Sequence, residues 1–395
     1  MLLMTLRKMM IPPATVSWLN NQETALRIRR YCHTFSTLVF ANTSPDLRNG
    51  EPVIMRLPLP ITLCLIVSLN IACSETESEP STETTTMPPA EAKTIDRLDP
   101  RLDALLAVEA TVEQVAEGFQ FIEGPVWVGG STDGHLLFSD IPADTVYRWS
   151  ETDGTSIFLN PVFLPELETN GQGGSNGLTL DLDGRVVLCE HGNRRISRID
   201  EDGIRTTLAN RFDGNRLNSP NDIVYHSSGA AFFTDPPYGL ASPDAAELDW
   251  SGIYRLDTDG TVHLLADEQS APNGIGLSPD ERTLYVANSD GDARHWMAYS
   301  VSDDLTLDDG IVLLDMTDSA DAGVPDGFAV DTEGNIWASG PGGIVVISPE
   351  GDHLGTVRPS EQPANAAFGN DGRTLYMTAR TSLYRISTSV EGLMP

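Results

Sequence analysis

The sequence predicts an all-β protein, a six-bladed β-propeller with a central channel. A unit of fixed order recurs six times: a polar residue stands before Gly, Asp or Ala, and in the last five units an apolar strand, a turn and a second strand follow. Successive units lie 39 to 53 residues apart, which suits propeller blades of four strands each. No alternation of strands and helices, which would indicate a parallel sheet, accompanies these units.

The stretch Arg216–Leu240, RLNSPNDIVYHSSGAAFFTDPPYGL, shows the unit most clearly. After an irregular loop it predicts a strand at Ile223–Tyr225, a turn at Ser227–Gly229 and a second strand at Ala231–Thr234, because apolar and β-branched runs are separated by turn residues. The final unit is one strand short. We expect Ala110–Ala116, which precedes the first unit, to supply this outer strand and so close the ring of blades.

Four regions follow one another along the 395 residues. Residues 1–54 show no core pattern and form an upstream extension, consistent with a start site assigned too early. Residues 55–73 join one basic residue to an apolar run and predict a signal peptide, cleaved at Cys73 as in a bacterial lipoprotein; ordinary secretion and a retained anchor stay open. Residues 74–108, acidic and rich in Ser, Thr and Pro at their start, predict a disordered tether. Residues 109–395 form the propeller domain.

The predicted signal places the mature protein outside the cytoplasm, as a periplasmic or outer-membrane lipoprotein facing the periplasm, or as a secreted protein. The formal net charge of −32 argues against nucleic acid or an anionic membrane surface as a partner, since both attract Lys and Arg. Membrane attachment would then come only from the lipid anchor. Of the four cysteines, Cys189 alone would stay unmodified in the mature domain, so no disulfide framework is expected. The oligomeric state stays open.

The residues that begin the six units predict a cation site. The first strand of each propeller blade lines the channel, so these residues form a ring at one of its mouths. All six have side-chain oxygens and two are carboxylates, which suits a hard cation such as Ca²⁺. The alternative is that Asn and Asp merely begin turns well. The ring consists of Glu123, Asn176, Asn221, Asn273, Asp326 and Asn365.

Other motifs in the sequence suggest different kinds of site. GGSNG at Gly173–Gly177 matches the nucleophile elbow of α/β-hydrolases, but a strand rather than a helix follows it, so we reject that interpretation. The histidines lack the spacing of a zinc site. His191, Arg195 and Arg216 stand in segments between strands, from which they would reach the mouth and contact substrate. The alternative is a structural role at the ends of strands.

Several motifs together resemble the gluconolactonase family, which includes regucalcin and is related to diisopropyl fluorophosphatase. The motifs include EGPVW, RLNSPNDIV, FFTDPPYGL, PNGIGLSPDE and PDGFAVD, and the resemblance covers about residues 112–387. It implies a six-bladed propeller with one divalent cation in the channel, for which we expect Ca²⁺ before Zn²⁺, Mn²⁺ or Mg²⁺. Matched by motif, Glu123, Asn273 and Asp326 would be metal ligands, and Asn221 a fourth ligand or a substrate contact.

The resemblance also implies that Asp326 is the catalytic carboxylate, acting as general base or as nucleophile. We expect Asn176, in the ring beside Asn221, to contact substrate. The predicted function is a metal-dependent lactonase, a hydrolase of carboxylic ester bonds that opens a sugar lactone. Two alternatives stay open: a phosphotriesterase or aryl-esterase activity at the same metal site, and a non-catalytic binding propeller with a structural Ca²⁺.

Overall fold

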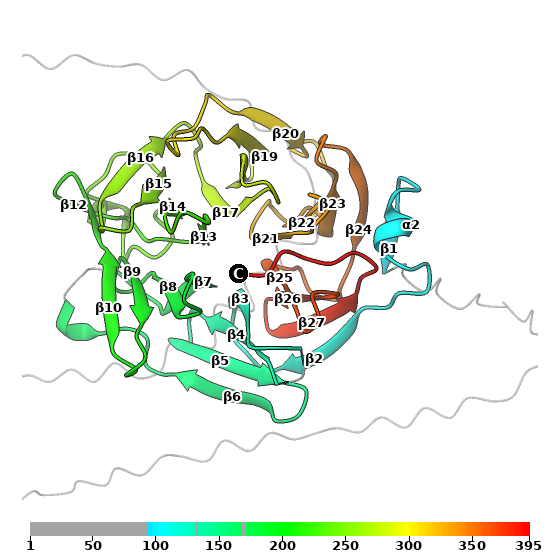
Figure 1. The fold of residues 1–395 in the computed structure, drawn as a ribbon, viewed down its shortest axis with the longest axis horizontal. Helices are drawn as coiled ribbons and strands as arrows, with labels where there is room; N and C mark the ends of the chain where they lie inside the picture. Colours follow the sequence, from blue (N-terminus) through cyan, green and yellow to red (C-terminus); the bar gives the residue numbers. More distant parts are fainter. Residues whose placement is uncertain (1–93, 132, 168–170) are drawn as a thin grey trace, which may run out of the picture. The chain divides into compact units, whose positions relative to one another are not determined.

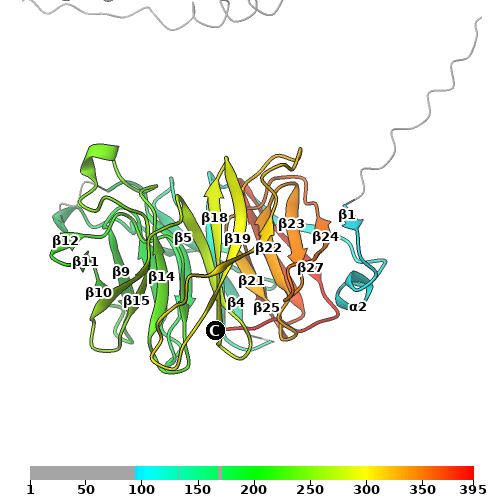
Figure 2. The same ribbon diagram turned by 90° about the horizontal axis from the view of Figure 1, so that it is seen from above.

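The computed structural model describes residues 94–131, 133–167 and 171–395, and the statements below concern these residues. Six antiparallel sheets surround a common axis (Figure 1), which confirms the predicted all-β, six-bladed propeller. In four of the sheets the strand nearest the axis comes first along the chain and the next strands follow outward. The other two sheets keep this order but each gains an outermost strand from the N-terminal side of the domain. The strands stand side by side along the axis when the domain is viewed from the edge (Figure 2).

The first three blades are formed in chain order. Blade 1 contains β3 (Ile122–Val128), β4 (His135–Asp140), β5 (Thr145–Ser150) and β6 (Gly154–Leu159); blade 2 contains β7 (Ser175–Leu180), β8 (Val186–Glu190), β9 (Arg195–Ile199) and β10 (Arg205–Ala209); blade 3 contains β13 (Ile223–Tyr225), β14 (Ala231–Asp235), β15 (Gly252–Leu256) and β16 (Val262–Ala266). A small hairpin of β11 (Arg211–Phe212) and β12 (Asn215–Arg216) joins blades 2 and 3. Short 3₁₀ turns occur at Pro165–Leu167 and Pro243–Ala245.

The last three blades complete the circle. Blade 4 contains β17 (Pro272–Leu277), β18 (Thr283–Asp290), β19 (Ala293–Ser300) and β20 (Ile311–Asp315); blade 5 contains β21 (Phe328–Val330), β22 (Ile336–Gly340), β23 (Gly343–Ile347) and β24 (His353–Val357); blade 6 contains β25 (Asn365–Gly369), β26 (Thr374–Ala379), β27 (Ser382–Ser387) and β2 (Glu113–Glu117). The outer strand of blade 6 thus comes from the N-terminal side of the domain. It lies close to the predicted Ala110–Ala116, and its pairing with β27 closes the ring.

The folded domain begins earlier than the composition indicated. β1 (Ile95–Arg97) pairs with β24 as a fifth strand of blade 5, and the short helix α2 (Leu102–Leu105) follows it. Leu102 and Leu106 are fully buried and pack in one apolar cluster with Trp337 and Phe368. The expected tether of residues 74–108 is therefore wrong at its C-terminal end, because apolar residues after position 94 find a surface to cover on blade 5.

Apolar side chains fill the spaces between neighbouring sheets. One cluster joins Phe232 and Ile253 of blade 3 to Ile275 and Val286 of blade 4. Such face-to-face packing fixes each blade against the next, so that the innermost strands are held around the axis. Cys189 is buried in β8 with a free thiol.

The predicted signal peptide, with its cleavage at Cys73, lies outside the described residues, as do residues 1–54 and the part of the tether up to residue 93. Export and lipid attachment therefore stay predictions. Within the described part of the chain, no helix has the length and apolar character needed to cross a membrane.

Candidate active site in the central channel

The structure brings the predicted ring residues to one end of the innermost strands. Three of them are the second residue of their strands, one is the first, and two precede their strands by two residues. Five are buried, with exposed fractions of 2 to 6%, and Asp326 is partly exposed. In chain order these residues are Glu123 (β3), Asn176 (β7), Asn221 (before β13), Asn273 (β17), Asp326 (before β21) and Asn365 (β25).

The innermost strands lose their regular register where the ring lies. The pairing slips between Glu123 and Val126 in blade 1, between Ser175 and Leu178 in blade 2, and between Pro272 and Ile275 in blade 4. Such irregularities release the backbone from the ladder and turn side chains in new directions. The first residues of these strands are therefore free to direct their side chains toward the axis.

Glycine follows the ring residue in four blades because the neighbouring blade lies too close for any side chain. A Cβ added to Gly124 would overlap the backbone of Asn176, and one added to Gly327 would overlap the side chain of Asn365. Gly177 and Gly274 meet the backbone of the next ring residue in the same way. The remaining two blades have Ala366 and, as the one charged residue at this position, Asp222.

Hydroxyl groups on the second strands fix the backbone of the ring. Ser139 Oγ in blade 1 donates to the carbonyl oxygen of Asn176 in blade 2 at 2.7 Å, and Thr234 Oγ1 in blade 3 donates to that of Asn273 in blade 4 at 2.7 Å. Both hydroxyl residues are fully buried. Each of these bonds crosses from one blade to the next, so the position of a ring residue depends on two blades.

Three carboxyl groups lie close enough in the channel to influence one another. Burial, together with a smaller contribution from the nearby Asp222 carboxylate, raises the pKa of Glu123 to about 7. Burial also raises the pKa of Asp222 to about 7. The pKa of Asp326 is raised well above its usual range by burial and then by the Glu123 and Asp222 carboxylates. No Lys or Arg of the described chain is among the groups that set these three pKa values.

Two ring asparagines act on these carboxylates. The Asn365 side chain favours the ionised forms of Glu123 and Asp222 and so opposes the rise of their pKa values, while its Oδ1 accepts the backbone N–H of Ala366 at 2.8 Å. The Asn273 side chain does the same for the pKa of Asp326. The oxygen of Asn365 is therefore already engaged within the protein, which suits it less as a metal ligand.

The donor set of the ring fits a hard cation. Counting His, Cys, Asp and Glu alone, no group of three or more in the described residues is arranged to hold a metal ion, so a site here needs amide oxygens as well. The side-chain amides of Asn176 and Asn221 form no hydrogen bond with other described residues, which leaves their oxygens available. Two carboxylates with amide oxygens, crowded and without a basic partner, make a set that Ca²⁺ accepts.

Three residues outside the ring, Arg195, His191 and Arg216, were expected to contact substrate, and the structure places Arg195 away from the mouth of the channel. Arg195 is 4% exposed and is engaged within blade 2, where it donates to Glu190 at 2.8 and 2.9 Å and to Thr207 at 2.7 Å. The expectation that Arg195 reaches the mouth is therefore wrong, because the buried Glu190 occupies its guanidinium.

His191 and Arg216 are held near the loops around the ring. His191 lies against Gly239, and burial lowers its pKa to about 4, so the His191 imidazole is neutral at pH 7. Its Nε2 is buried without a hydrogen-bond partner among the described residues. Arg216 lies on β12, where its backbone N–H donates to Glu247 at 2.8 Å and its guanidinium lies 3.5 Å from the Leu167 carbonyl oxygen. These positions neither support nor contradict a substrate contact, so that role of His191 and Arg216 stays a prediction.

Tyr238 and Asp222 join the site although the sequence did not single them out. The Tyr238 side chain is 45% exposed in the loop after β14, and the side chains of Asn273 and Ser289 are among the groups that influence its pKa. Partial burial raises its pKa to about 12, with a further contribution from Asp326. A signal for Asp222 was present, since it is a carboxylate where four other units have glycine.

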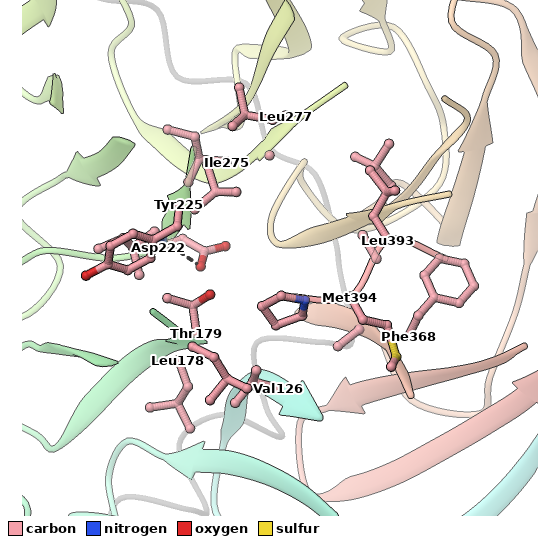
Figure 3. Close-up of a pocket in the computed structure, with 18 of the residues that line it drawn as sticks. Val126, Leu178, Thr179, Asp222, Tyr225, Ile275, Leu277, Phe368, Leu393 and Met394 are labelled. Carbon is pink, nitrogen blue, oxygen red and sulfur yellow. Dashed lines mark hydrogen bonds between the residues drawn. The ribbon is translucent and has the colours of Figure 1, made fainter. Parts of the chain in front are cut away.

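A separate cavity of about 570 Å³ lies along the channel beside Asp222 (Figure 3). Apolar side chains of the innermost strands line it, including Val126, Leu178 and Ile275, and the C-terminal residues Leu393 and Met394 lie at its side. Asp222 points into this space and Asn365 also lines it. A hydroxyl-rich substrate would find few partners among these side chains, so we place the reaction at the polar ring instead.

Comparison with known proteins identifies similar chains. Residues 121–381 match the family model described as the SMP-30/Gluconolactonase/LRE-like region. A gluconolactonase from Zymomonas mobilis is 39% identical over 312 residues, which cover 75% of this chain and 87% of that protein. A pentonolactonase from Haloferax volcanii is 30% identical over 264 residues, covering 65% and 80%. The solved structure of a gluconolactonase from Xanthomonas campestris is 32% identical, with a TM-score of 0.66, and covers 76% of this chain and 96% of its own.

Proposed function

Because the chain belongs to the SMP-30/gluconolactonase/LRE-like family, we propose that it is a lactonase, a hydrolase that opens the ester bond of a sugar lactone. The observation that carries this proposal is the group of three carboxyl groups, Glu123, Asp222 and Asp326, in the channel without a basic partner. Buried charges of one sign persist only when a counter-ion or protons offset them. The channel is therefore a place for a cation beside a polar substrate.

We further propose that one divalent cation, Ca²⁺ before others, binds Glu123, Asn273 and Asp326, with Asn221 as a fourth ligand. The bound cation would act as a Lewis acid toward the ester carbonyl. Glu123 and Asp326 supply the negative charge that holds a divalent ion. Asn273 and Asn221 supply neutral oxygens, which complete the coordination without adding repulsion.

Asp326 is the proposed general base. It is partly exposed whereas Glu123 is buried, so it is the ring carboxylate that water and substrate reach. Burial and its acidic neighbours raise its pKa in the cation-free channel, and a bound cation would favour the ionised form that accepts a proton. In the reaction Asp326 takes a proton from the attacking water while a new C–O bond forms at the lactone carbonyl. The ring C–O bond then breaks, and the leaving alkoxide takes up a proton to give the hydroxy acid.

The test follows acid release in a pH-stat with purified full-length protein, using a six-carbon and a five-carbon aldonolactone. Because such lactones also open spontaneously, the Asp326→Asn variant serves as the matched control. We expect release above the spontaneous rate, loss of this excess after chelation, and its return on adding Ca²⁺. An excess rate that survives exhaustive chelation would contradict the cation requirement, and no excess on any lactone would contradict the activity itself.

A further inference from the structure

The segment that leads into Asp326 belongs to no helix or strand. It comprises residues 316–327 and joins β20 of blade 4 to β21 of blade 5. Backbone carbonyl groups that lie outside a helix or a sheet ladder need hydrogen-bond donors from elsewhere when the chain folds. The side chain that supplies these donors therefore decides the course of the chain up to Asp326.

One side chain, that of Arg294 near the start of β19, holds most of this segment. Its guanidinium donates to four backbone carbonyl oxygens, those of Thr317, of Ser319 at 2.9 Å, of Asp321 at 3.2 Å and of Gly323 at 3.4 Å. The acceptors are alternate residues, so the segment curves around the guanidinium. A planar group with several N–H donors in a fixed arrangement suits this role, and an ammonium group does not.

The end of the segment is held by the neighbouring strand of the same blade. Ser289 on β18 lies directly opposite Arg294 in the ladder, and its Oγ donates to the carbonyl oxygen of Pro325. The backbone N–H of Asp326, the next residue, donates to the carbonyl oxygen of Ser339 in blade 5 at 3.0 Å. Blade 4 therefore holds the segment at two places, and Asp326 directly follows the second.

The chain between these two places has little conformational freedom. Val324 alone separates Gly323, the last residue that Arg294 binds, from Pro325. A proline has a fixed φ angle and restricts the residue before it to extended conformations. A displacement of Gly323 would therefore be passed on to Pro325 and to the backbone of Asp326.

Arg255 of blade 3 binds backbone in the same way at a different place. Its guanidinium donates to the carbonyl oxygens of Asp304 at 2.8 Å and Leu305 at 3.1 Å, in the loop between β19 and β20. This loop follows the last residue of β19, whereas Arg294 lies near the first, so the two arginines hold loops at opposite ends of that strand. Arg255 thus provides a matched comparison away from the ring.

We propose that Arg294 is a positioning residue for the reaction: it holds the segment before Asp326 so that this carboxylate keeps its place in the ring. The inference deepens the proposed function and rests on it, because the exact place of Asp326 matters for turnover only if Asp326 is the general base. Arg294 acts on Asp326 through the backbone of the segment and not through contact with the substrate.

The first test compares Arg294→Lys with Arg255→Lys in the purified full chain at saturating Ca²⁺. Lysine keeps the positive charge and an apolar stem, but its single nitrogen cannot bind four separate carbonyl groups. In Arg294→Lys we expect kcat to fall about 10- to 100-fold, as for a slightly misplaced reacting group, with KM changed by no more than about 2-fold. Arg255→Lys should leave both constants unchanged. An equal fall in the two variants, or an unchanged kcat in Arg294→Lys, would overturn the proposal.

The second test needs neither cation nor substrate. Hydrogen exchange in the metal-free protein reports on the N–H of Asp326 and on the N–H of Gly342, which donates to the carbonyl oxygen of Ala322 within the segment. Both should exchange faster in Arg294→Lys and at the wild-type rate in Arg255→Lys. Unchanged exchange in Arg294→Lys also overturns the proposal.

Two further outcomes are covered by the design. If Arg294→Lys fails to fold, Arg294→Gln, which keeps two side-chain N–H donors, takes its place in both tests. If the wild-type protein opens no lactone, the proposed function is contradicted instead, and hydrogen exchange alone then decides whether Arg294 holds the segment before Asp326.

Discussion

Two groups of buried carboxylates in this propeller are balanced in different ways. Glu190 in blade 2 is fully buried and accepts two bonds from Arg195, one from Arg205 at 3.2 Å and one from Ser197 at 2.5 Å. Its charge is offset inside the protein by side chains of neighbouring strands. This arrangement is complete without any ligand and serves the packing of blade 2 against its neighbours.

The carboxylates of the channel have no such partners. Glu123 accepts the backbone N–H of Gly124, and Asp222 accepts that of Ile223. The Asp222 carboxylate raises the pKa of Glu123, and both carboxylates raise the pKa of Asp326. Hydrogen bonds from neutral donors do not cancel three charges. Burial alone therefore does not mark a site. A buried carboxylate paired with an arginine is structural, whereas several neighbouring carboxylates without an arginine favour binding of a cation from solution.

The largest effect is expected at the channel, from Asp326→Asn. The change keeps the size of the side chain and one oxygen ligand but removes the proton acceptor. Turnover should fall about 10²- to 10⁴-fold even at saturating Ca²⁺, which is the usual contribution of general base catalysis. The measurement is initial lactonase rate across a Ca²⁺ titration. Full recovery of the rate by excess Ca²⁺ would reduce Asp326 to a ligand.

Breaking the other group should affect stability and not the cation. Arg195→Leu leaves Glu190 buried with its main partner gone, at a cost of about 3–5 kcal/mol in the free energy of unfolding. Arg385→Leu is the control, since it breaks the more exposed ion pairs with Glu113 and Glu151 and should cost about 1 kcal/mol or less. Denaturant titration gives both values. If the folded Arg195→Leu variant lost Ca²⁺ affinity, that result would contradict the separation of the Glu190 group from the channel carboxylates.

Asn273→Ala should weaken the cation site without removing the base. The variant loses a neutral ligand, so we expect Ca²⁺ affinity to fall about 10- to 100-fold, by analogy with other losses around metal sites. Turnover at saturating Ca²⁺ should return to within a few-fold of the wild type. A rate that stays low at every Ca²⁺ concentration would give Asn273 a part in the chemistry itself.

A smaller effect concerns pH. In the cation-free protein the pKa values of Glu123 and Asp222 are about 7, above the usual 4.3 and 3.9, so the native state binds more protons than the unfolded state between about pH 4 and 7. Stability should therefore fall as pH rises through this window. We expect the melting temperature with chelator to be several degrees lower at pH 7.5 than at pH 5, with Ca²⁺ restoring most of the loss.

Asp235 provides the control for this effect. Burial raises its pKa to about 7 as well, but backbone N–H groups of Asn218 and Ser219 and the charge of Arg194 surround it. Asp222→Asn should reduce both the pH slope and the response to Ca²⁺, whereas Asp235→Asn should reduce only the slope. Equal responses to Ca²⁺ in the two variants would count against Asp222 as a member of the cation site.

The fold could be predicted because each blade repeats one order of turn residue, strand, turn and strand. The same repeat located five buried ring residues and the partly exposed Asp326, since equivalent positions in a propeller meet at one mouth. The family resemblance is confirmed as well. Closure of blade 6 by an N-terminal strand was predicted from a missing strand, and the observed β2 differs from the expected segment only in its bounds.

The features that could not be predicted from the sequence depend on contacts between residues of different strands and loops. Arg195 stands near His191 in the sequence, yet its direction is decided by Glu190, five residues earlier and on the neighbouring strand. Tyr238 belongs to a long loop whose course depends on Ser219. The start of the domain was placed too late. The few apolar residues after position 94 form no clear periodic pattern in the sequence, and they become buried only by packing on blade 5.

Anomalous diffraction from crystals grown with Mn²⁺ or Ca²⁺ tests the central claim most directly, because it locates the ion without reference to activity. We expect one strong peak per chain on the channel axis, at bonding distance from the carboxylates of Glu123 and Asp326 and the amide oxygen of Asn273. A channel without a peak at saturating cation, or a peak held only by residues outside the ring, would contradict it.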